Sequence, residues 1–334
     1  MVTKSLFGIL DSTEVYAFEI KSDTLCATVI EYGAILQSLV FKNTDCVLGF
    51  DTLEGYIKDV SNQGATVGRY ANRIGGAQFV LNNKLYTLDK NDNDNCLHGG
   101  ATGFGKRLYS GEQTGENSVT FKIHSPSGEG GFPATLDCAV TFTVLDSTLK
   151  IEYNAISDAD TIVNFTNHAY FNLGSPDIKS TKLTINADSI TPVDKYLIPT
   201  GELMSVKGSA FDFTTPRAIG EYLDCDEEQI VIGNGYDHNF VLGDTKCYRK
   251  NCVHAFCPES NITMYCSTDM PGVQLYTANF LDEKCGKNNN DLIKNMGFCL
   301  ETQFWPDTPN KTHFPSCKLY KNETFTSITE YSFE

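Results

Sequence analysis

The feature that most constrains the fold is an alternation of apolar and polar residues with a period of two. Residues 136–144 (LDCAVTFTV) carry an apolar side chain at every second position, and the pattern resumes in residues 149–154 after the pair Asp146-Ser147. An extended chain points successive side chains to opposite faces, so one face of such a segment is buried and the other is wet. The stretch 136–154 therefore predicts an antiparallel β-hairpin.

The same pattern recurs in short segments along the chain, such as residues 119–123 and 183–185. Asn82-Asn83 and Asn234-Gly235 follow short apolar runs, and both pairs are predicted as hairpin turns. Helix signals are few; Asp51 is predicted to cap a short helix over residues 51–57. We expect an all-β fold, a large antiparallel β-sandwich with few short helices.

No linker, repeat or low-complexity tract interrupts the chain, so residues 1–334 are predicted to form a single domain. Residues 89–95 (DKNDNDN) are polar enough to form a surface excursion from it.

The formal net charge of −16 disfavours partners that present phosphate groups, so we expect neither nucleic acid nor an anionic membrane. The N-terminal apolar patch is too short for a signal peptide, and no run reaches the roughly 18–20 apolar residues of a membrane helix. We therefore expect a cytoplasmic protein whose twelve cysteines are mostly buried, reduced thiols. The group Cys247, Cys252, Cys257 and Cys266 around His254 lacks the paired spacing of zinc knuckles, which disfavours a metal site there.

Glu301 is the most unusual charged residue, because it lies in the apolar segment 297–307 (GFCLETQFWPD). A buried carboxylate costs several kcal/mol unless it is paired or its pKa moves. A structural ion pair is the commoner explanation for one such residue, and a catalytic carboxyl is the alternative. Trp305, the only tryptophan, either packs beneath such a site or fills the core.

Three of the six histidines lie in informative surroundings: His98 before two glycines, His168 in the segment 165–173 (FTNHAYFNL), and His238 just past a turn. If residues 165–173 form a strand, every second side chain from His168 shares its face. Arg69 and Arg73 flank Asn72. A structural role is the common explanation for each residue alone. Together they favour a polar site for a ligand with several hydroxyls and apolar C–H faces, which describes a sugar.

Seven motifs occur in one order along the chain: residues 64–74 (GATVGRYANRI), 97–100 (LHGG), 167–173 (NHAYFNL), 197–201 (LIPTG), 236–240 (YDHNF), 271–277 (PGVQLYT) and 301–303 (ETQ). With these motifs the chain resembles the aldose 1-epimerase (galactose mutarotase) family over nearly its whole length. Two stretches depart from the family pattern, residues 131–134 (GFPA) and 318–323 (KLYKNE). They affect loops, and no proposed catalytic position is lost.

The resemblance implies a sandwich of the galactose mutarotase type that interconverts the α and β anomers of free hexoses such as galactose and glucose, with no cofactor or metal. It implies that Glu301 is the general base and His168 the general acid. It also implies that the partner is a small aldohexose, bound by Asn72, Arg73, His98, Asp237 and Gln274. We expect a monomer or a weak homodimer.

Four other functions remain open from the residues. A hexose 6-phosphate epimerase would need a second cationic patch, which Arg69 with a Lys or Arg on a loop could supply. A metalloenzyme could hold iron with His98, His168 and Glu301. A glycosidase would use two carboxylates, such as Glu301 and Asp237. A sugar-binding module without catalysis could use the same sandwich, since fold does not fix function.

Overall fold

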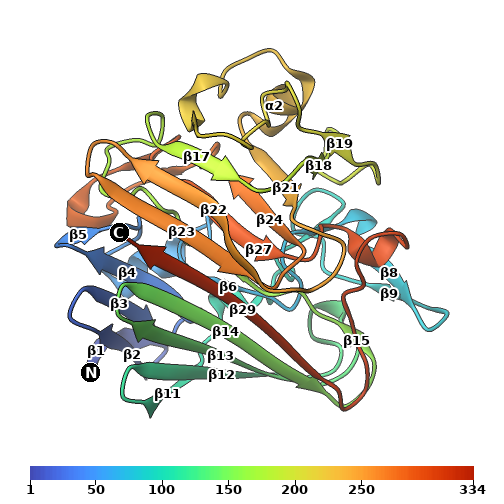
Figure 1. The fold of residues 1–334 in the computed structure, drawn as a ribbon. Helices are drawn as coiled ribbons and strands as arrows, with labels where there is room; N and C mark the ends of the chain where they lie inside the picture. The colour runs from blue at the N-terminus through green and yellow to red at the C-terminus, as the bar shows by residue number, and fades with distance from the viewer.

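The computed structural model describes all residues 1–334 as a nearly all-β protein with two short α-helices (Figure 1). The largest sheet has nine strands, and the chain order across it is not sequential. Its strands, from edge to edge, are β11 (Ser110–Gly115), β12 (Ser118–Ser125), β13 (Leu136–Leu145), β14 (Thr148–Ser157), β29 (Thr324–Phe333), β23 (Ile262–Thr268), β22 (Arg249–Cys257), β17 (Lys182–Ile185) and β20 (Arg217–Ala218).

Two five-stranded sheets complete the main architecture. The N-terminal sheet contains β1 (Val2–Leu10), β2 (Thr13–Lys21), β3 (Leu25–Ile30), β4 (Ile35–Phe41) and β5 (Thr44–Asp45). The third sheet contains, in spatial order, β19 (Met204–Ser205), β18 (Ser189–Thr191), β21 (Asp237–Val241), β24 (Gly272–Tyr276) and β27 (Cys299–Gln303). The strand pairs in all three sheets are antiparallel, so the predicted all-β antiparallel fold is confirmed.

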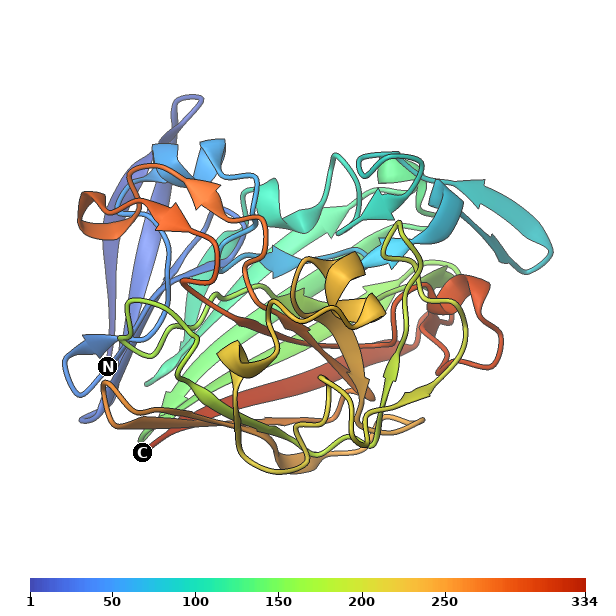
Figure 2. The same cartoon turned by 90° about the horizontal axis from the view of Figure 1, so that it is seen from above.

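The chain also forms five two-stranded ribbons. They are β6 (Thr66–Val67) with β16 (Thr166–Asn167), β7 (Arg73–Ile74) with β10 (Cys96–Leu97), β8 (Gln78–Leu81) with β9 (Lys84–Thr87), β15 (Thr161–Ile162) with β28 (Lys318–Leu319), and β25 (Asp282–Glu283) with β26 (Leu292–Ile293). Seen from above, the β8–β9 hairpin extends away from the body of the molecule (Figure 2). The helices are α1 (Leu53–Lys58) and α2 (Glu228–Gly233), and neither is long and apolar enough to cross a membrane.

One continuous apolar core joins the three sheets, with buried residues such as Ile20 on β2, Val140 on β13 and Leu275 on β24. The β13–β14 hairpin confirms the alternation in the sequence: from Leu136 to Val144, every second side chain is buried. Asn82 and Asn83 have φ angles of 51° and 61°, as a tight hairpin turn between β8 and β9 requires. Burial of one face and the turn chemistry therefore specify these two hairpins.

Two local predictions are wrong. Residues 230–232 belong to α2 instead of a strand, and Asn234 ends that helix in the left-handed region with φ 55°; the preference of Asn for this region serves a helix end as well as a hairpin. Thr52, not Asp51, caps α1, because its Oγ1 accepts the Gly55 N–H at 3.2 Å. The condition that residues 165–173 form one strand is not met, because only the two residues of β16 do.

Candidate active site

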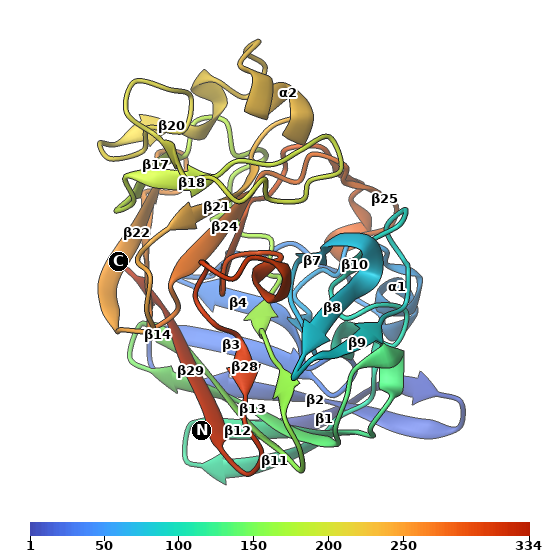
Figure 3. The same cartoon turned by 90° about the vertical axis from the view of Figure 1, so that its right-hand side faces the viewer.

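The candidate site is built on one face of the three neighbouring strands β21, β24 and β27. Residues directly opposite each other in an antiparallel pair share a face. Gln274 of β24 therefore stands between Asn239 of β21 and Glu301 of β27, and in the next row Tyr276 stands between Asp237 and Cys299. The polar residues of three distant chain segments meet on this face because of the strand register. Figure 3 shows β21 and β24 with β7 and β10 beside them.

The opposite face of β27 is attached to the nine-stranded sheet. The carbonyl of Leu300 accepts a hydrogen bond from the Tyr331 hydroxyl at 2.9 Å, and Thr302 Oγ1 lies 2.5 Å from Thr329 Oγ1. Both partners belong to β29. The alternation along β27 thus directs Glu301 away from the core sheet, on a strand that the sheet supports from behind.

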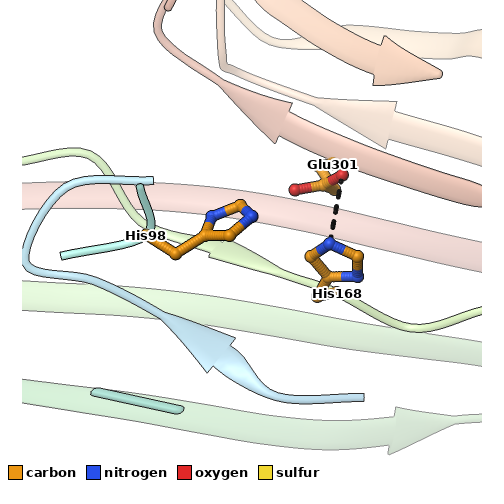
Figure 4. Close-up of side chains that lie close together, drawn as sticks. All are labelled: His98, His168 and Glu301. Carbon is orange, nitrogen blue, oxygen red and sulfur yellow. Dashed lines mark ion pairs between the residues drawn. The ribbon is translucent and has the colours of Figure 1, made fainter. Parts of the chain in front are cut away.

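Glu301 and His168 form a buried pair at the floor of a cavity. Nε2 of His168 lies 3.6 Å from Oε1 of Glu301, and the exposed fractions of the two residues are only 5% and 2% (Figure 4). Oε2 of Glu301 is buried without a hydrogen-bond partner in the protein. The His98 ring points toward the pair, with its centroid 5.3 Å from that of His168. A carboxylate oxygen and two imidazole nitrogens of these three residues lie within 4.8 Å of one another.

His168 is positioned by its backbone and by aromatic neighbours. It follows β16, and its N–H and carbonyl bond to Ala65 and Gly64, each at 2.9 Å. The imidazole packs against the rings of Tyr170 and Tyr276, with centroid distances of 5.1 and 6.2 Å. Contacts on both backbone and ring hold the imidazole in one orientation toward Glu301.

The ribbon of β7 and β10 supplies the other wall. Asn72 precedes β7 and His98 follows β10, so the pairing of Arg73 with Leu97 brings them together. The Asn72 backbone N–H donates to Nδ1 of His98 at 3.2 Å. Since Nδ1 is then an acceptor, a neutral His98 carries its proton on Nε2. His98 is therefore held as a hydrogen-bond donor through Nε2.

Arg73 is the cation of the site, and carboxylates fix its position. Its Nε lies 2.7 Å from Oδ2 of Asp92, and its NH1 nitrogen lies 3.9 Å from Oδ2 of Asp237. Gln274 donates from Nε2 to the other oxygen of Asp237 at 2.7 Å. These contacts link the ribbon to the third sheet through Asp237, which is itself buried.

The cavity has a volume of about 260 Å³. This is slightly below the roughly 300–1,000 Å³ of pockets for drug-sized ligands, so it suits a small molecule. Its floor is polar, and Tyr170, Tyr276 and Phe280 give it an aromatic component. The full lining is Val60, Ser61, Asn62, Asn72, Arg73, Leu97, His98, His168, Tyr170, Asp237, Tyr276, Phe280, Asp282, Glu283 and Glu301.

Burial dominates the electrostatics of the site. Burial and the nearby Asp237 carboxylate raise the pKa of Glu301 well above its ordinary range, and Arg73 opposes this only in part. Burial lowers the pKa of His168 to about 4. Burial, assisted by His168 and Arg73, also lowers the pKa of His98 well below its ordinary value. The cavity therefore favours uncharged forms of its acid–base groups.

The structure brings the seven candidate residues from the sequence together. Six of them line the cavity, whereas Gln274 lies behind Asp237 and contacts its carboxylate. Sequence reasoning missed Tyr170 and Tyr276, each two residues from a chosen candidate, and this two-residue spacing was the available signal. It also missed Asp92, which lies in the loop expected to be only a surface excursion.

Three other residues with open roles lie away from the cavity. Arg69 is buried and donates to the carbonyls of Pro133 and Ala134, both at 2.8 Å, so it cannot supply the cationic patch suggested for a sugar phosphate. His238 is buried on the opposite face of β21. Trp305 is part of the core, where its Nε1–H donates to the Pro271 carbonyl at 3.0 Å.

An antiparallel β-sandwich with a carboxyl and an imidazole at the floor of a small polar cavity defines an enzyme of the acid–base type that suits a carbohydrate. Comparison with known proteins gives the particular family. The family model for aldose 1-epimerase matches residues 16–332, and the chain belongs to the aldose 1-epimerase family.

Named relatives and solved structures agree with this assignment. The chain is 41% identical to galactose mutarotase from Bos taurus and 40% identical to that from Homo sapiens, each over 99% of this chain and 98% of the relative. The galactose 1-epimerase structure from Lactobacillus acidophilus NCFM matches with a TM-score of 0.90 at 26% identity, covering 100% of this chain and 98% of that one. The GalM/aldose epimerase homologue from C. elegans matches with a TM-score of 0.87 at 32% identity, covering 95% and 98%. The chain is thus an enzyme that interconverts the anomers of an aldose.

Proposed function

We propose that this enzyme interconverts the α and β anomers of free hexoses such as galactose and glucose, with Glu301 as general base and His168 as general acid. The observation that carries the proposal is the buried pair itself, with Nε2 and Oε1 3.6 Å apart at the floor of the cavity. Asn72, Arg73, His98, Asp237 and Gln274 bind or position the sugar in this proposal. Residues 1–334 act as one domain, since one apolar core joins the three sheets.

The reaction needs one proton shared by the two groups. Glu301 takes the proton from the C1 hydroxyl while His168 gives one to the ring oxygen, the C1–O5 bond breaks, and the open aldehyde forms. Rotation about C1–C2 exposes the other face of the carbonyl. The ring then closes as Glu301 returns a proton to O1 and His168 recovers one from the hydroxyl of C5. Each positioned acid or base contributes about 10²–10⁴-fold.

Burial suits this cycle because both states of the pair contain one exchangeable proton, besides the proton that the imidazole keeps on its other nitrogen. The ring-closed complex needs Glu301 ionised and His168 protonated, whereas the open intermediate has a neutral carboxylic acid and a neutral imidazole. The shifted pKa values favour the neutral arrangement. They therefore stabilise the pair in the form that it takes after ring opening. His98 can donate from Nε2 to oxygen as negative charge develops.

The pH dependence of kcat/KM follows from the number of exchangeable protons on the pair in the free enzyme. As pH falls through about 4, His168 gains a proton that leaves two on the pair, and Glu301 can no longer accept one. As pH rises through the raised pKa of Glu301, the pair loses its last proton and His168 has none to donate. We expect activity to rise through about pH 4, reach a plateau, and fall on the alkaline side. Mutarotation rates measured by polarimetry across this pH range test the predicted profile. A sharp loss of activity between pH 5 and 7 would contradict it.

The direct test of the proposed function is the rate at which α-galactose and α-glucose relax to equilibrium, followed by polarimetry after exhaustive chelation. We expect strong acceleration that chelation leaves unchanged, because the Glu301–His168 pair supplies both proton transfers. Loss of activity on chelation, with recovery on adding iron or another divalent metal, would instead support a metal held by His98, His168 and Glu301. Galactose binding without acceleration would leave only a binding module.

The charge at the cavity mouth favours a free sugar over a sugar phosphate. Asp282 and Glu283 of β25 line the mouth, while the cation Arg73 is already paired with Asp92. A phosphate dianion at roughly 8 Å from one carboxylate is disfavoured by about 1 kcal/mol in water. The two carboxylates together cost about 2 kcal/mol, so we expect glucose 6-phosphate to be a poorer substrate than glucose by about 30-fold in kcat/KM at low ionic strength.

The double variant Asp282→Asn, Glu283→Gln tests this selection. Removing the two charges should raise kcat/KM for glucose 6-phosphate by about 30-fold relative to glucose, and added salt should reduce the difference. The variant Asp291→Asn is the matched control, since Asp291 is an exposed carboxylate that does not line the cavity. An unchanged preference in the double variant would mean that shape, not charge, excludes the phosphate.

Within the same proposal the protein acts in the cytoplasm on a small aldohexose, as a monomer or a weak homodimer. All twelve cysteines are free thiols, as expected in a reducing compartment. Size-exclusion chromatography with light scattering tests the oligomeric state.

A further inference from the structure

Cys299 is buried in the site, and it takes no part in the proposed proton transfers. It lies on β27 two residues before Glu301, so both side chains point to the same face of the strand. Its thiol Sγ lies 3.5 Å from Nδ1 of His168, and the residue is fully buried. His168 thus has Glu301 at one ring nitrogen and Cys299 at the other.

We propose that the Cys299 thiol is a positioning residue that keeps the retained ring proton of His168 on Nδ1, so that Nε2, the nitrogen that faces Glu301, is the one that exchanges a proton with the sugar. In the imidazolium, Nδ1–H donates to a lone pair of Sγ, and Nε2–H is directed into the cavity. When Nε2 gives its proton to the ring oxygen, the neutral imidazole that remains carries its proton on Nδ1, which still donates to Sγ. Nε2 is then free to recover a proton from the hydroxyl of C5.

The chemistry of the thiol fits this task better than that of a carboxylate would. Partners of catalytic histidines are often carboxylates, which stabilise the imidazolium and raise its pKa. A thiol is a weak donor and a weak acceptor without charge, so it orients the ring in either state and favours neither strongly. Burial, with Glu301 and Asp237 nearby, raises the pKa of Cys299 well above its ordinary value, so the thiol keeps its proton.

This arrangement suits a reversible reaction. His168 gives up a proton when the ring opens and recovers one when it closes, so a partner that locked one protonation state would slow the opposite step. The inference rests on the proposed role of His168 for its effect on rate. The tautomer itself is a property of the free enzyme and can be measured without any activity assay.

The first experiment is ¹⁵N NMR of the wild-type protein with labelled histidine, with the His168 signals identified by their loss in His168→Asn. We expect the neutral Nδ1–H tautomer at pH 7, with Nε2 unprotonated. The Nε2–H tautomer would overturn the proposal, whether or not the enzyme proves active. The tautomer is read in the wild-type protein, and the variant serves only to identify its signals.

The second experiment compares Cys299→Ala with Cys299→Ser. We expect the alanine variant to lower kcat by about tenfold at nearly constant KM and to give a mixture of His168 tautomers. The serine variant keeps a group that both donates and accepts, and should restore kcat to within about threefold of wild type. Cys138→Ala, a buried thiol on β13 outside the cavity, should change neither quantity. Wild-type kcat and tautomer in Cys299→Ala would overturn the proposal.

Discussion

Replacing Glu301 by glutamine is expected to lower kcat for mutarotation by about 10²–10⁴-fold with little change in KM. Glutamine has nearly the same shape but cannot take the proton from the C1 hydroxyl. The other groups that contact the sugar remain in place, so ground-state binding should survive. Polarimetric rates with α-galactose at several concentrations separate the two parameters. A variant with kcat within about threefold of wild type would remove Glu301 from the role of base.

Glu31→Gln is the matched control for this change. Glu31 is also a buried carboxyl, but it accepts hydrogen bonds from the backbone N–H groups of Tyr16 and Gly111, away from the cavity. Its amide variant should lose thermal stability and keep kcat. Glu301→Gln should keep its thermal stability and lose kcat, because Oε2 of Glu301 has no hydrogen-bond partner to lose. Thermal melts of both variants, beside their rates, distinguish a chemical role from a structural one.

The parts of the fold that local physics determines were predictable from the sequence. The β13–β14 hairpin has one buried face, and alternation reports that burial directly. Asn82-Asn83 forms its turn because asparagine tolerates positive φ. The same tolerance misled the prediction at Asn234, which ends a helix instead. A local preference for one backbone conformation does not specify the element on either side of it.

The sequence predicted which residues belong to the candidate site, but not which of them contact one another. Ordered motifs identified the candidates through a family resemblance, whereas alternation by itself could only place Glu301 and Gln303 on one face of a strand. The position of Gln274 opposite Glu301 depends on strand register between segments that are distant in sequence. The contact of Arg73 with Asp92, in a loop, and that of Cys299 with His168 depend on the complete fold.

Replacing His168 by asparagine is expected to lower kcat by about 10²–10³-fold, because the variant loses the proposed general acid and the imidazole that remains near Glu301 is a poor substitute. His98 is the neighbouring imidazole, but its Nδ1 is engaged by the Asn72 backbone and its burial disfavours the protonated form. The acid limb of the pH profile should also disappear from the variant, since that limb reports the second proton on His168. Retention of the limb near pH 4 would assign it to another group.

His238→Asn provides the control, because this buried histidine packs against Phe211 with centroids 4.7 Å apart on the opposite face of β21. It should lower stability and leave kcat unchanged. The double variant Glu301→Gln, His168→Asn gives the sharper test. If the two residues hold one proton between them, removing the second should add little to the first, and the loss should be about that of the worse single variant. Losses that multiply would show that the two residues act independently, and would contradict a shared proton.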